Sequence, residues 1–280
     1  MRIDLHTHTN RSDGTDTPTE LVEKAGACGL DVLAITDHDS TAGWDEAAAA
    51  ADRVGIALVR GIEISTMLDG VSVHLLGYGF DPADASLLAE LDRILGGRDS
   101  RLPALLDQLA EHDMPLTVDD VVAESGNAAA SGRPHVADAM VTAGYVADRD
   151  EAFRDWLYDH GPVYVERYGA PLSEAIELVR EAGGVSVIAH PWARRGRRVL
   201  TPDVIAELAG KGLAGLEVDH NNHSDAVRAE LRALAVDLDL VVTGSSDYHG
   251  TGKGPEFHLG ANTTAPEQYE RLLSRHLPTG

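Results

Sequence analysis

The sequence predicts an α/β fold in which βα units build a parallel sheet or barrel. Short apolar runs alternate with amphipathic stretches along most of the chain, and this alternation is typical of βα units. Histidines and carboxylates stand at the ends of several of these apolar runs. Because parallel strands end on one face of such a fold, we expect these polar side chains to meet there.

Seven apolar runs are the strand candidates, at residues 2–5, 32–36, 57–64, 71–77, 185–189, 215–218 and 240–243. Helices fit between most of them. Thr17 is expected to cap a helix that starts at Pro18, and Glu20 completes a capping box. Ser224 is expected to cap a later helix.

The stretch from about 83 to 171 breaks this rhythm. Its pattern is helical throughout, and its one strand-like run is 163–166. We therefore expect a helical subdomain of residues 83–171, a substrate lid inserted into a β/α domain formed by residues 1–82 and 172–280. Gly96-Gly97 and Gly126-Asn127 are expected to be joints within it.

The composition excludes several classes of protein. The 280-residue chain has a formal net charge of −23, which opposes adhesion to long nucleic acid. Its single cysteine, Cys28, rules out an internal disulfide and a zinc site made of thiolates. No apolar run approaches the ~20 residues of a membrane span, and no secretory leader is recognisable, so we expect a cytoplasmic protein without membrane association. Nothing in the sequence assigns an oligomeric state.

The chain carries an unusual set of candidate metal ligands. His6 and His8 end the first strand candidate, and alternation along extended backbone places both imidazoles on one side. A single His-x-His pair commonly just caps a strand. Here, however, further candidates follow later runs, and the expected ligand set is His6, His8, Asp13, His38, Glu63, His74, His190, Asp247 and His249. Imidazoles and carboxylates favour Zn, Mn or Fe over Ca or Mg. His74 sits early in its run, which an antiparallel strand would explain.

This number of ligands suits two or three divalent ions that share a bridging carboxylate. Three such ions carry +6 against −3 from Asp13, Glu63 and Asp247. The excess suits a phosphate dianion and a hydroxide better than a neutral amide or ester. Because a divalent ion lowers the pKa of bound water to about 7, we expect phosphoester hydrolysis by a metal-activated hydroxide.

A set of motifs resembles those of the PHP (polymerase and histidinol phosphatase) family: His6-x-His8, Ser12-Asp13-Gly14, Thr36-Asp37-His38-Asp39, Gly61-Ile62-Glu63, His74, Ala189-His190-Pro191 and Ser246-Asp247-x-His249. The helical insert and Gly132-Arg133-Pro134-His135 make the chain similar to the stand-alone phosphoesterases of that family. These include nucleoside 3′,5′-bisphosphate phosphatases and a short-RNA 5′→3′ exonuclease.

The resemblance implies a distorted seven-stranded β/α barrel of TIM-like type with a trinuclear centre of Mn, Fe or Zn. It assigns the first ion to His6, His8, Glu63 and Asp247, the second to Glu63, His74 and His190, and the third to Asp13, His38 and His249. The expected catalytic residues are Asp13, His38, Glu63 and Asp247.

Three residues are candidates for binding substrate phosphate. Arg133 occupies a position where the resemblance implies an arginine on phosphate, and a surface arginine beside a helix start is the alternative. Arg167 is a second candidate, with an ion pair to Glu166 or a neighbour as the alternative. His135 could donate to phosphate or protonate a leaving group, or it could equally cap or pack a helix.

Several other polar groups have two interpretations. The basic run 194–198 could steer a polyanionic substrate or form a solvated loop. Asp37 and Asp39 could orient the imidazole of His38, and Asp39 could instead cap a helix. His220 and His223 could line the pocket, but a loop outside it is the expectation.

We therefore expect a metal-dependent phosphoesterase acting on a phosphomonoester or terminal phosphodiester of a small nucleotide. The substrate would be a nucleoside 3′,5′-bisphosphate or the 5′ end of a short oligonucleotide. The enzymatic alternatives are a histidinol-phosphate phosphatase and a metal amidohydrolase. A binding module that uses metals only for stability is the non-catalytic alternative.

Overall fold

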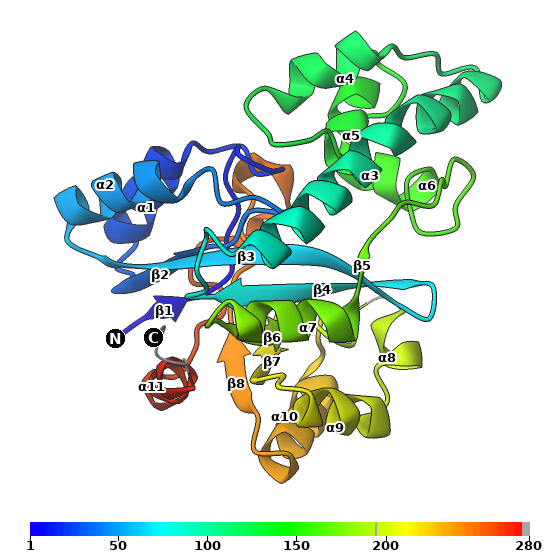
Figure 1. Ribbon diagram of the computed structural model, residues 1–280. Coiled ribbons are helices and arrows are strands. Elements are labelled where there is room, and N and C mark those ends of the chain that lie inside the picture. Colours follow the sequence, from blue (N-terminus) through cyan, green and yellow to red (C-terminus); the bar gives the residue numbers. More distant parts are fainter. Residues whose placement is uncertain (194, 276–280) are drawn as a thin grey trace.

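A curved mixed sheet forms the centre of the computed structural model, which describes residues 1–193 and 195–275 (Figure 1). The strand order is β1-β2-β3-β4-β6-β7-β8, with β5 paired to β3. Beyond the last strand, the Asp247 amide donates to the His6 carbonyl at 3.0 Å, and the His8 amide donates to the Tyr248 carbonyl at 2.9 Å. These bonds join the two ends of the sheet, so the seven-stranded path is a nearly closed barrel.

The strands are β1 (Ile3–Asp4), β2 (Val32–Ile35), β3 (Ala57–Leu68), β4 (Val71–Tyr78), β5 (Ala170–Pro171), β6 (Val185–Ile188), β7 (Gly215–Asp219) and β8 (Val241–Gly244). All seven predicted strands are present. β4 is antiparallel to both β3 and β6, as the position of His74 indicated. The α/β barrel class predicted from the sequence is therefore confirmed.

Two strand predictions need correction. β3 continues to Leu68 instead of ending at Ile64, because it forms a hairpin with β4. Asp69 and Gly70, at the turn, have φ values of 48° and 74°, as a two-residue type I′ turn requires. Residues 163–166 are not a strand. Val163 instead packs into the core of the helical insert, and the short β5 follows it.

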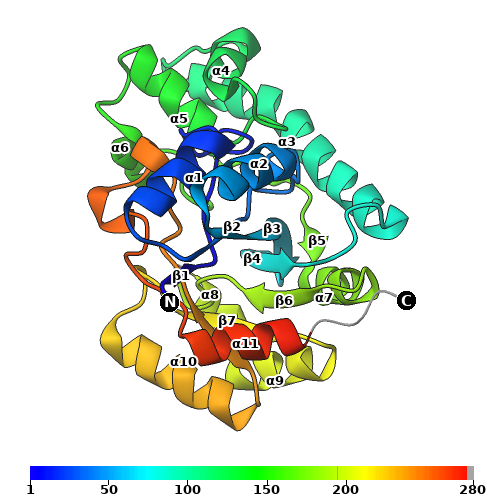
Figure 2. The same cartoon turned by 90° about the vertical axis from the view of Figure 1, so that its left-hand side faces the viewer.

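The helices of the barrel lie around the outside of the sheet. They are α1 (Pro18–Ala27), α2 (Trp44–Val54), α7 (Leu172–Glu181), α8 (Gly196–Val199), α9 (Pro202–Gly210), α10 (Asp225–Asp237) and α11 (Pro266–Ser274), with 3-10 turns η1 (Gly250–Gly252) and η2 (Pro255–Phe257). Figure 2 shows α1 and α2 beside β2 and β3, with α9, α10 and α11 on the opposite side. Both predicted caps are present: Thr17 forms a capping box with Glu20, and Ser224 accepts from the Val227 amide.

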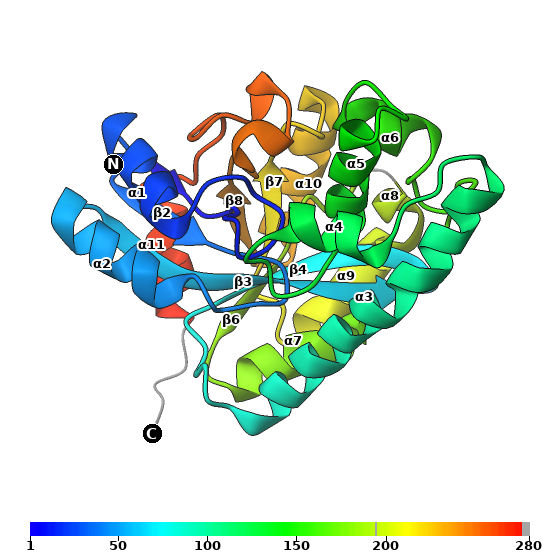
Figure 3. The same cartoon turned by 90° about the horizontal axis from the view of Figure 1, so that it is seen from above.

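The insert consists of α3 (Ala85–Glu111), α4 (Val118–Ser125), α5 (Arg133–Thr142) and α6 (Arg149–Asp155). Figure 3 shows these helices gathered on one side of the barrel, away from α1 and α2. They enclose a separate apolar core. α3 belongs to both parts, because Leu91 packs into the barrel core and Leu105 into the insert core.

The predicted joint at Gly96-Gly97 is wrong, because α3 runs through it without a break. Gly97 has a packing role instead: a Cβ atom there would lie 3.1 Å from the Cβ atom of Tyr168. The second predicted joint is confirmed, since α4 ends at Gly126 with a φ of 53°. Among the described residues, no helix combines the length and apolar character needed to cross a membrane.

Candidate metal centre

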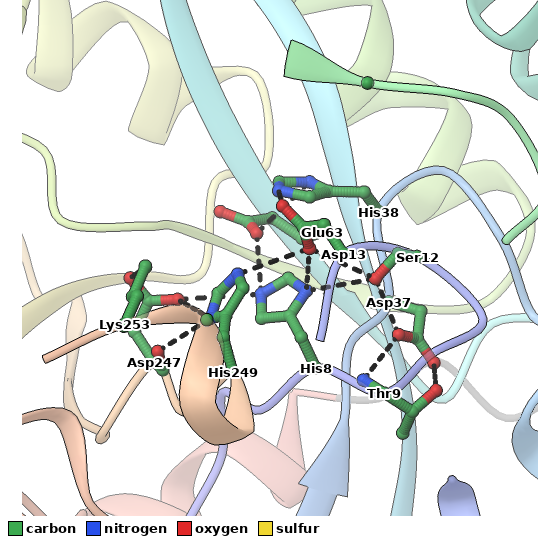
Figure 4. A network of polar contacts seen from close by, with 12 residues as sticks. His8, Thr9, Ser12, Asp13, Asp37, His38, Glu63, Asp247, His249 and Lys253 are labelled. Carbon is green, nitrogen blue, oxygen red and sulfur yellow. Dashed lines mark hydrogen bonds and ion pairs between the residues drawn. The ribbon is translucent and has the colours of Figure 1, made fainter. Parts of the chain in front are cut away.

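The predicted ligands lie close together, and Figure 4 shows six of them: His8, Asp13, His38, Glu63, Asp247 and His249. They come from six strands or from the loops that follow those strands. The β1 segment supplies His6, His8 and Asp13, β2 supplies His38, β3 supplies Glu63, β4 supplies His74, β6 supplies His190, and the β8 segment supplies Asp247 and His249. Most are buried, and His38, His74 and His190 are partly buried. The antiparallel direction of β4 turns His74 toward the same point.

Glu63 lies at the middle of this cluster. Its Oε2 atom is 3.2 Å from His6 Nε2 and 3.0 Å from His8 Nε2. Its other oxygen, Oε1, is 2.7 Å from His74 Nδ1 and 3.4 Å from His190 Nε2. Oε2 also lies 3.3 Å from His38 Nδ1. One carboxylate therefore presents its two oxygens to two different groups of histidines, which is the geometry of a bridging ligand.

Two further carboxylates complete the cluster. Asp247 Oδ1 is 3.5 Å from His6 Nε2 and 3.6 Å from His8 Nε2. Asp13 is 3.3 Å from His249 Nε2 and 3.7 Å from His38 Nε2. These contacts lie within the three ligand groups that the family resemblance implied, but His38 Nδ1 also lies 3.3 Å from Glu63 Oε2, and His249 Nδ1 lies 3.5 Å from Asp247 Oδ1. His8 likewise reaches beyond its group, because its Nδ1 atom lies 3.6 Å from Asp13. The division of the ligands among ions therefore stays a prediction.

The donor atoms fit divalent metal ions. Metal bonds of about 2.1 Å in tetrahedral or octahedral geometry separate neighbouring ligand atoms by roughly 3.0–3.4 Å, close to the observed spacings. His6 Nε2 and His8 Nε2 face each other at 3.1 Å, a contact that a shared cation stabilises. His38 Nδ1 is buried without a hydrogen-bond partner. Only nitrogen and oxygen donors are present, the set that suits Zn, Mn or Fe.

Most of the cluster is held in the protonation state that metal binding needs. Burial lowers the pKa of His38 to about 3 and that of His249 to about 4, so both imidazoles are neutral. Burial raises the pKa of Asp13 and of Glu63, but the surrounding histidines outweigh it and hold both values well below the usual range. His6 differs: burial favours its neutral form, yet Glu63, Glu217 and Asp247 raise its pKa well above the usual value.

Glu217 supports the ligands from behind and was missed in the sequence. It lies on β7, is completely buried, and accepts from His6 Nδ1 at 3.0 Å. Its second oxygen accepts from the His190 amide at 2.9 Å. A carboxylate in this place fixes the tautomer and direction of a ligating imidazole. The available signal was a charged residue inside an otherwise apolar strand.

We expect Glu217→Gln to weaken metal binding by roughly 10- to 100-fold. The amide has no negative charge and only one oxygen, so it cannot serve both His6 and His190. Metal content after dialysis at limiting metal measures the effect, with Glu207→Gln as the control, because Glu207 is exposed on α9. Unchanged metal retention in the Glu217 variant would contradict this role.

Asp247 is held by two groups that the sequence did not assign to the site. His220 Nε2 lies 3.2 Å from Asp247 Oδ2, and the Lys253 ammonium contacts the same oxygen. His220 does occupy a loop, as expected, but it is buried and its ring centroid is 5.0 Å from that of His190. The expectation that it lies outside the pocket is therefore wrong.

Asp37 and Asp39 have structural partners other than His38. Asp37 accepts from the Ser12 hydroxyl at 2.7 Å and from the Thr9 hydroxyl at 2.6 Å, which ties the loop after β1 to the loop after β2. Asp39 accepts from the Ser65 amide at 2.6 Å and is paired with Arg98 of α3 at 2.7 Å. These carboxylates position the ligand-bearing loops instead of touching the imidazole.

The three predicted phosphate-binding residues lie in the insert or the segment that leaves it. Arg133 donates to Asp159 at 2.7 Å and to the Leu157 carbonyl at 2.9 Å. Arg167 donates to the Tyr168 carbonyl at 3.1 Å, and the described residues show no ion pair between Arg167 and Glu166. Both ring nitrogens of His135 are engaged by backbone: Nδ1 accepts from the Gly132 amide, and Nε2 donates to the Ser12 carbonyl. This is the capping role that the sequence left open.

The described residues of the basic run 194–198 lie in two different environments. Arg195 lines a small cavity with His74, Asp159 and His190, next to the ligand cluster. Arg197 instead pairs with Glu230 and stacks on Trp192. Arg194 lies outside the described residues.

Comparison with known proteins agrees with this geometry. Residues 4–113 match the PHP domain family. The chain is 36% identical over 255 residues to a 3′,5′-nucleoside bisphosphate phosphatase of Chromobacterium violaceum, covering 90% of this chain and 88% of that protein. It is 34% identical over 248 residues to a 5′-3′ exoribonuclease of Haemophilus influenzae, covering 89% of this chain and 90% of that protein.

A solved structure is also closely similar. The crystal structure of a proposed metal-dependent phosphoesterase from Bifidobacterium adolescentis superposes with a TM-score of 0.93 at 38% identity, covering 99% of this chain and 97% of that one. The sequence motifs, the barrel fold and the cluster of candidate ligands all agree with these similarities to known proteins. The chain belongs to the PHP family of metal-dependent phosphoesterases.

Proposed function

We propose that this enzyme hydrolyses a phosphoester of a small nucleotide, either a nucleoside 3′,5′-bisphosphate or the 5′ end of a short oligonucleotide, with two or three ions of Mn, Fe or Zn. The observation that carries the proposal is the position of Glu63, whose Oε2 faces His6, His8 and His38 while its Oε1 faces His74 and His190. A bridging carboxylate favours adjacent ions, which suit the charge of a transferring phosphoryl group.

The substrate class is supported by a cleft beside the ligand cluster. It has a volume of about 710 Å³ and lies between barrel loops and the insert, with Ser12, Lys253 and Arg149 among its lining residues. The two relatives named above act on a nucleoside bisphosphate and on RNA, which supports a nucleotide here. The cleft has room for a nucleoside once a phosphate is placed on the ions.

In the proposed mechanism, metal ions supply the reactive groups and protein side chains hold the ligands in position. Bound divalent ions would polarise phosphoryl oxygens and provide a nucleophile at neutral pH. His220 and Lys253 hold Asp247 Oδ2, so that Oδ1 stays directed at His6 and His8. Arg98 holds Asp39 and thereby the loop that carries His38.

A screen of the purified, metal-loaded enzyme tests the proposal. Nucleoside 3′,5′-bisphosphates and 5′-phosphorylated di- to tetranucleotides should be hydrolysed faster than histidinol phosphate, and simple amides should not react. Elemental analysis of the same sample gives the identity and number of ions. Faster turnover of histidinol phosphate or of an amide would replace the nucleotide assignment, and a full metal complement without hydrolysis of any phosphoester would favour a binding module.

A further inference from the structure

The loop that carries Asp13 is held by the helical insert through its own backbone. Each of the three successive carbonyls of residues 11–13 accepts a hydrogen bond from the insert. The donors are the Ala129 amide at 3.0 Å, His135 Nε2 at 3.0 Å and Arg149 Nη1 at 3.4 Å. The position of this ligand-bearing loop therefore depends on the insert as well as on the barrel.

His135 fixes the loop one residue before the ligand. Its Nδ1 atom accepts from the Gly132 amide at 3.0 Å, so in the neutral imidazole Nε2 carries the proton and donates to the Ser12 carbonyl. His135 and Ser12 are both buried. Breaking a buried hydrogen bond is costly, because the carbonyl would be left without a partner, so this contact holds the insert against the loop.

Arg149 joins two loops whose ligands are predicted to share an ion. It begins α6, and its Nη1 atom donates to the Gly252 carbonyl at 3.3 Å as well as to the Asp13 carbonyl. The Gly252 amide in turn donates to the His249 carbonyl at 3.2 Å. The side chains of Asp13 and His249 approach each other to 3.3 Å. One guanidinium thus links the backbones behind both ligands.

Asp138 of α5 holds the Arg149 guanidinium in place. Its two oxygens accept from Nε and Nη2 of Arg149, both at 2.5 Å, a paired contact that leaves Nη1 to reach the barrel. Burial lowers the pKa of Arg149, but Asp138 and Asp13 outweigh it and raise the value. The fit is close, because a Cβ atom on Gly252 would collide with Nη1. The insert therefore presents a charged, fixed donor to the two loops.

We infer that Arg149 is a positioning residue of the metal centre, which sets the affinity of the ion proposed at Asp13, His38 and His249. Ligands that are held in place before an ion arrives lose less freedom when it binds, so they bind it more tightly. The inference rests on the metal centre of the proposed function, but not on which phosphoester is hydrolysed.

Binding of Mn²⁺ alone, without a nucleotide, tests this inference. The metal-free enzyme is dialysed against a series of buffered Mn²⁺ concentrations, and bound ions are counted by elemental analysis. In Arg149→Met one ion per chain should need roughly 10- to 100-fold more free Mn²⁺ than in wild type. Arg149→Lys keeps a charged donor and should recover part of the affinity. Arg154→Met is the matched control, because Arg154 lies on the same helix with its side chain 65% exposed.

Gly252→Ala tests the same contact without removing a charge. The added Cβ atom would displace only the end of the flexible Arg149 side chain, so the fold should survive while the same ion binds roughly tenfold more weakly. This second variant decides the question if Arg149→Met does not fold. Unchanged Mn²⁺ binding in both variants would overturn the inference.

Kinetics with a nucleotide separate positioning from substrate binding, since Arg149 also lines the cleft. At limiting Mn²⁺ the kcat of Arg149→Met should fall, and saturating Mn²⁺ should restore it with KM unchanged. A raised KM with wild-type Mn²⁺ binding would assign Arg149 to the substrate and overturn the inference. A lower melting temperature of the metal-free enzyme with wild-type Mn²⁺ binding would make Arg149 purely structural, with the same consequence.

Failure of the proposed function would look different. If wild type bound neither Mn²⁺ nor Zn²⁺, the metal centre itself would be refuted, and the inference with it. If both variants bound Mn²⁺ more weakly but wild type hydrolysed no nucleotide, the role of Arg149 would stand and only the substrate assignment would fall.

Discussion

Glu63→Gln is expected to lower kcat/KM for a nucleotide substrate by on the order of 10³-fold. Glu63 presents Oε2 to His6 and His8 and Oε1 to His74 and His190. The amide nitrogen of glutamine is a hydrogen-bond donor and cannot bind a metal ion, so one of the two histidine groups loses the oxygen ligand that it shares. Glutamine therefore cannot bridge two adjacent ions. Elemental analysis should therefore show fewer ions per chain, measured beside the kinetics.

The control for this change is again Glu207→Gln, which removes an exposed carboxylate from α9. It should keep both the wild-type metal content and the wild-type turnover. If Glu63→Gln kept the full metal content and lost less than about tenfold in kcat/KM, Glu63 would not bridge the ions.

Asp13→Ala and His38→Ala are expected to reduce turnover by roughly 100-fold each while leaving the fold intact. Both side chains lie in loops at the end of the barrel, apart from its apolar core. His38 Nδ1 has no hydrogen-bond partner, and its imidazole contacts the candidate ligands Glu63 and Asp13 at 3.3 and 3.7 Å, so its removal changes the site and not the apolar core. Circular dichroism and melting curves check the fold, and kcat together with metal content checks the site.

His258→Ala is the matched control for these variants, because His258 is exposed and has only a weak contact with the Pro255 carbonyl. It should change neither turnover nor metal content. Unfolding of Asp13→Ala or His38→Ala without loss of metal would refute the catalytic assignment, because the side chain would then act through the fold.

The prediction of the fold succeeded where the pattern was local. Apolar runs marked the seven barrel strands, and Thr17 and Ser224 marked two helix starts by side-chain chemistry that involves only a few neighbouring residues. It failed at the end of β3, where the Asp69-Gly70 turn extends the pairing with β4. It also failed at Val163, because a buried residue of an irregular segment has the same local signal as one in a strand.

The prediction of the site also succeeded where the signal was local. Imidazoles and carboxylates after successive apolar runs identified the candidate ligands, because a parallel sheet brings strand ends together whatever their separation in sequence. The supporting groups were missed. Lys253 and His220 reach Asp247 from different loops, and the charge of Glu217 inside a buried strand did not by itself show which residues it contacts.

The sequence by itself determined the chemical identity of the candidate metal ligands and the strands that carry them, since both depend on residue type and short-range alternation. Only the tertiary structure decided which way those ligands point. The positive φ values of His190 and Asp247, 29° and 54°, and the direction of β4 set their angles. The structure alone also placed Arg149 against the loops that carry Asp13 and His249, because the packing of the insert on the barrel brings together residues that share no repeating pattern.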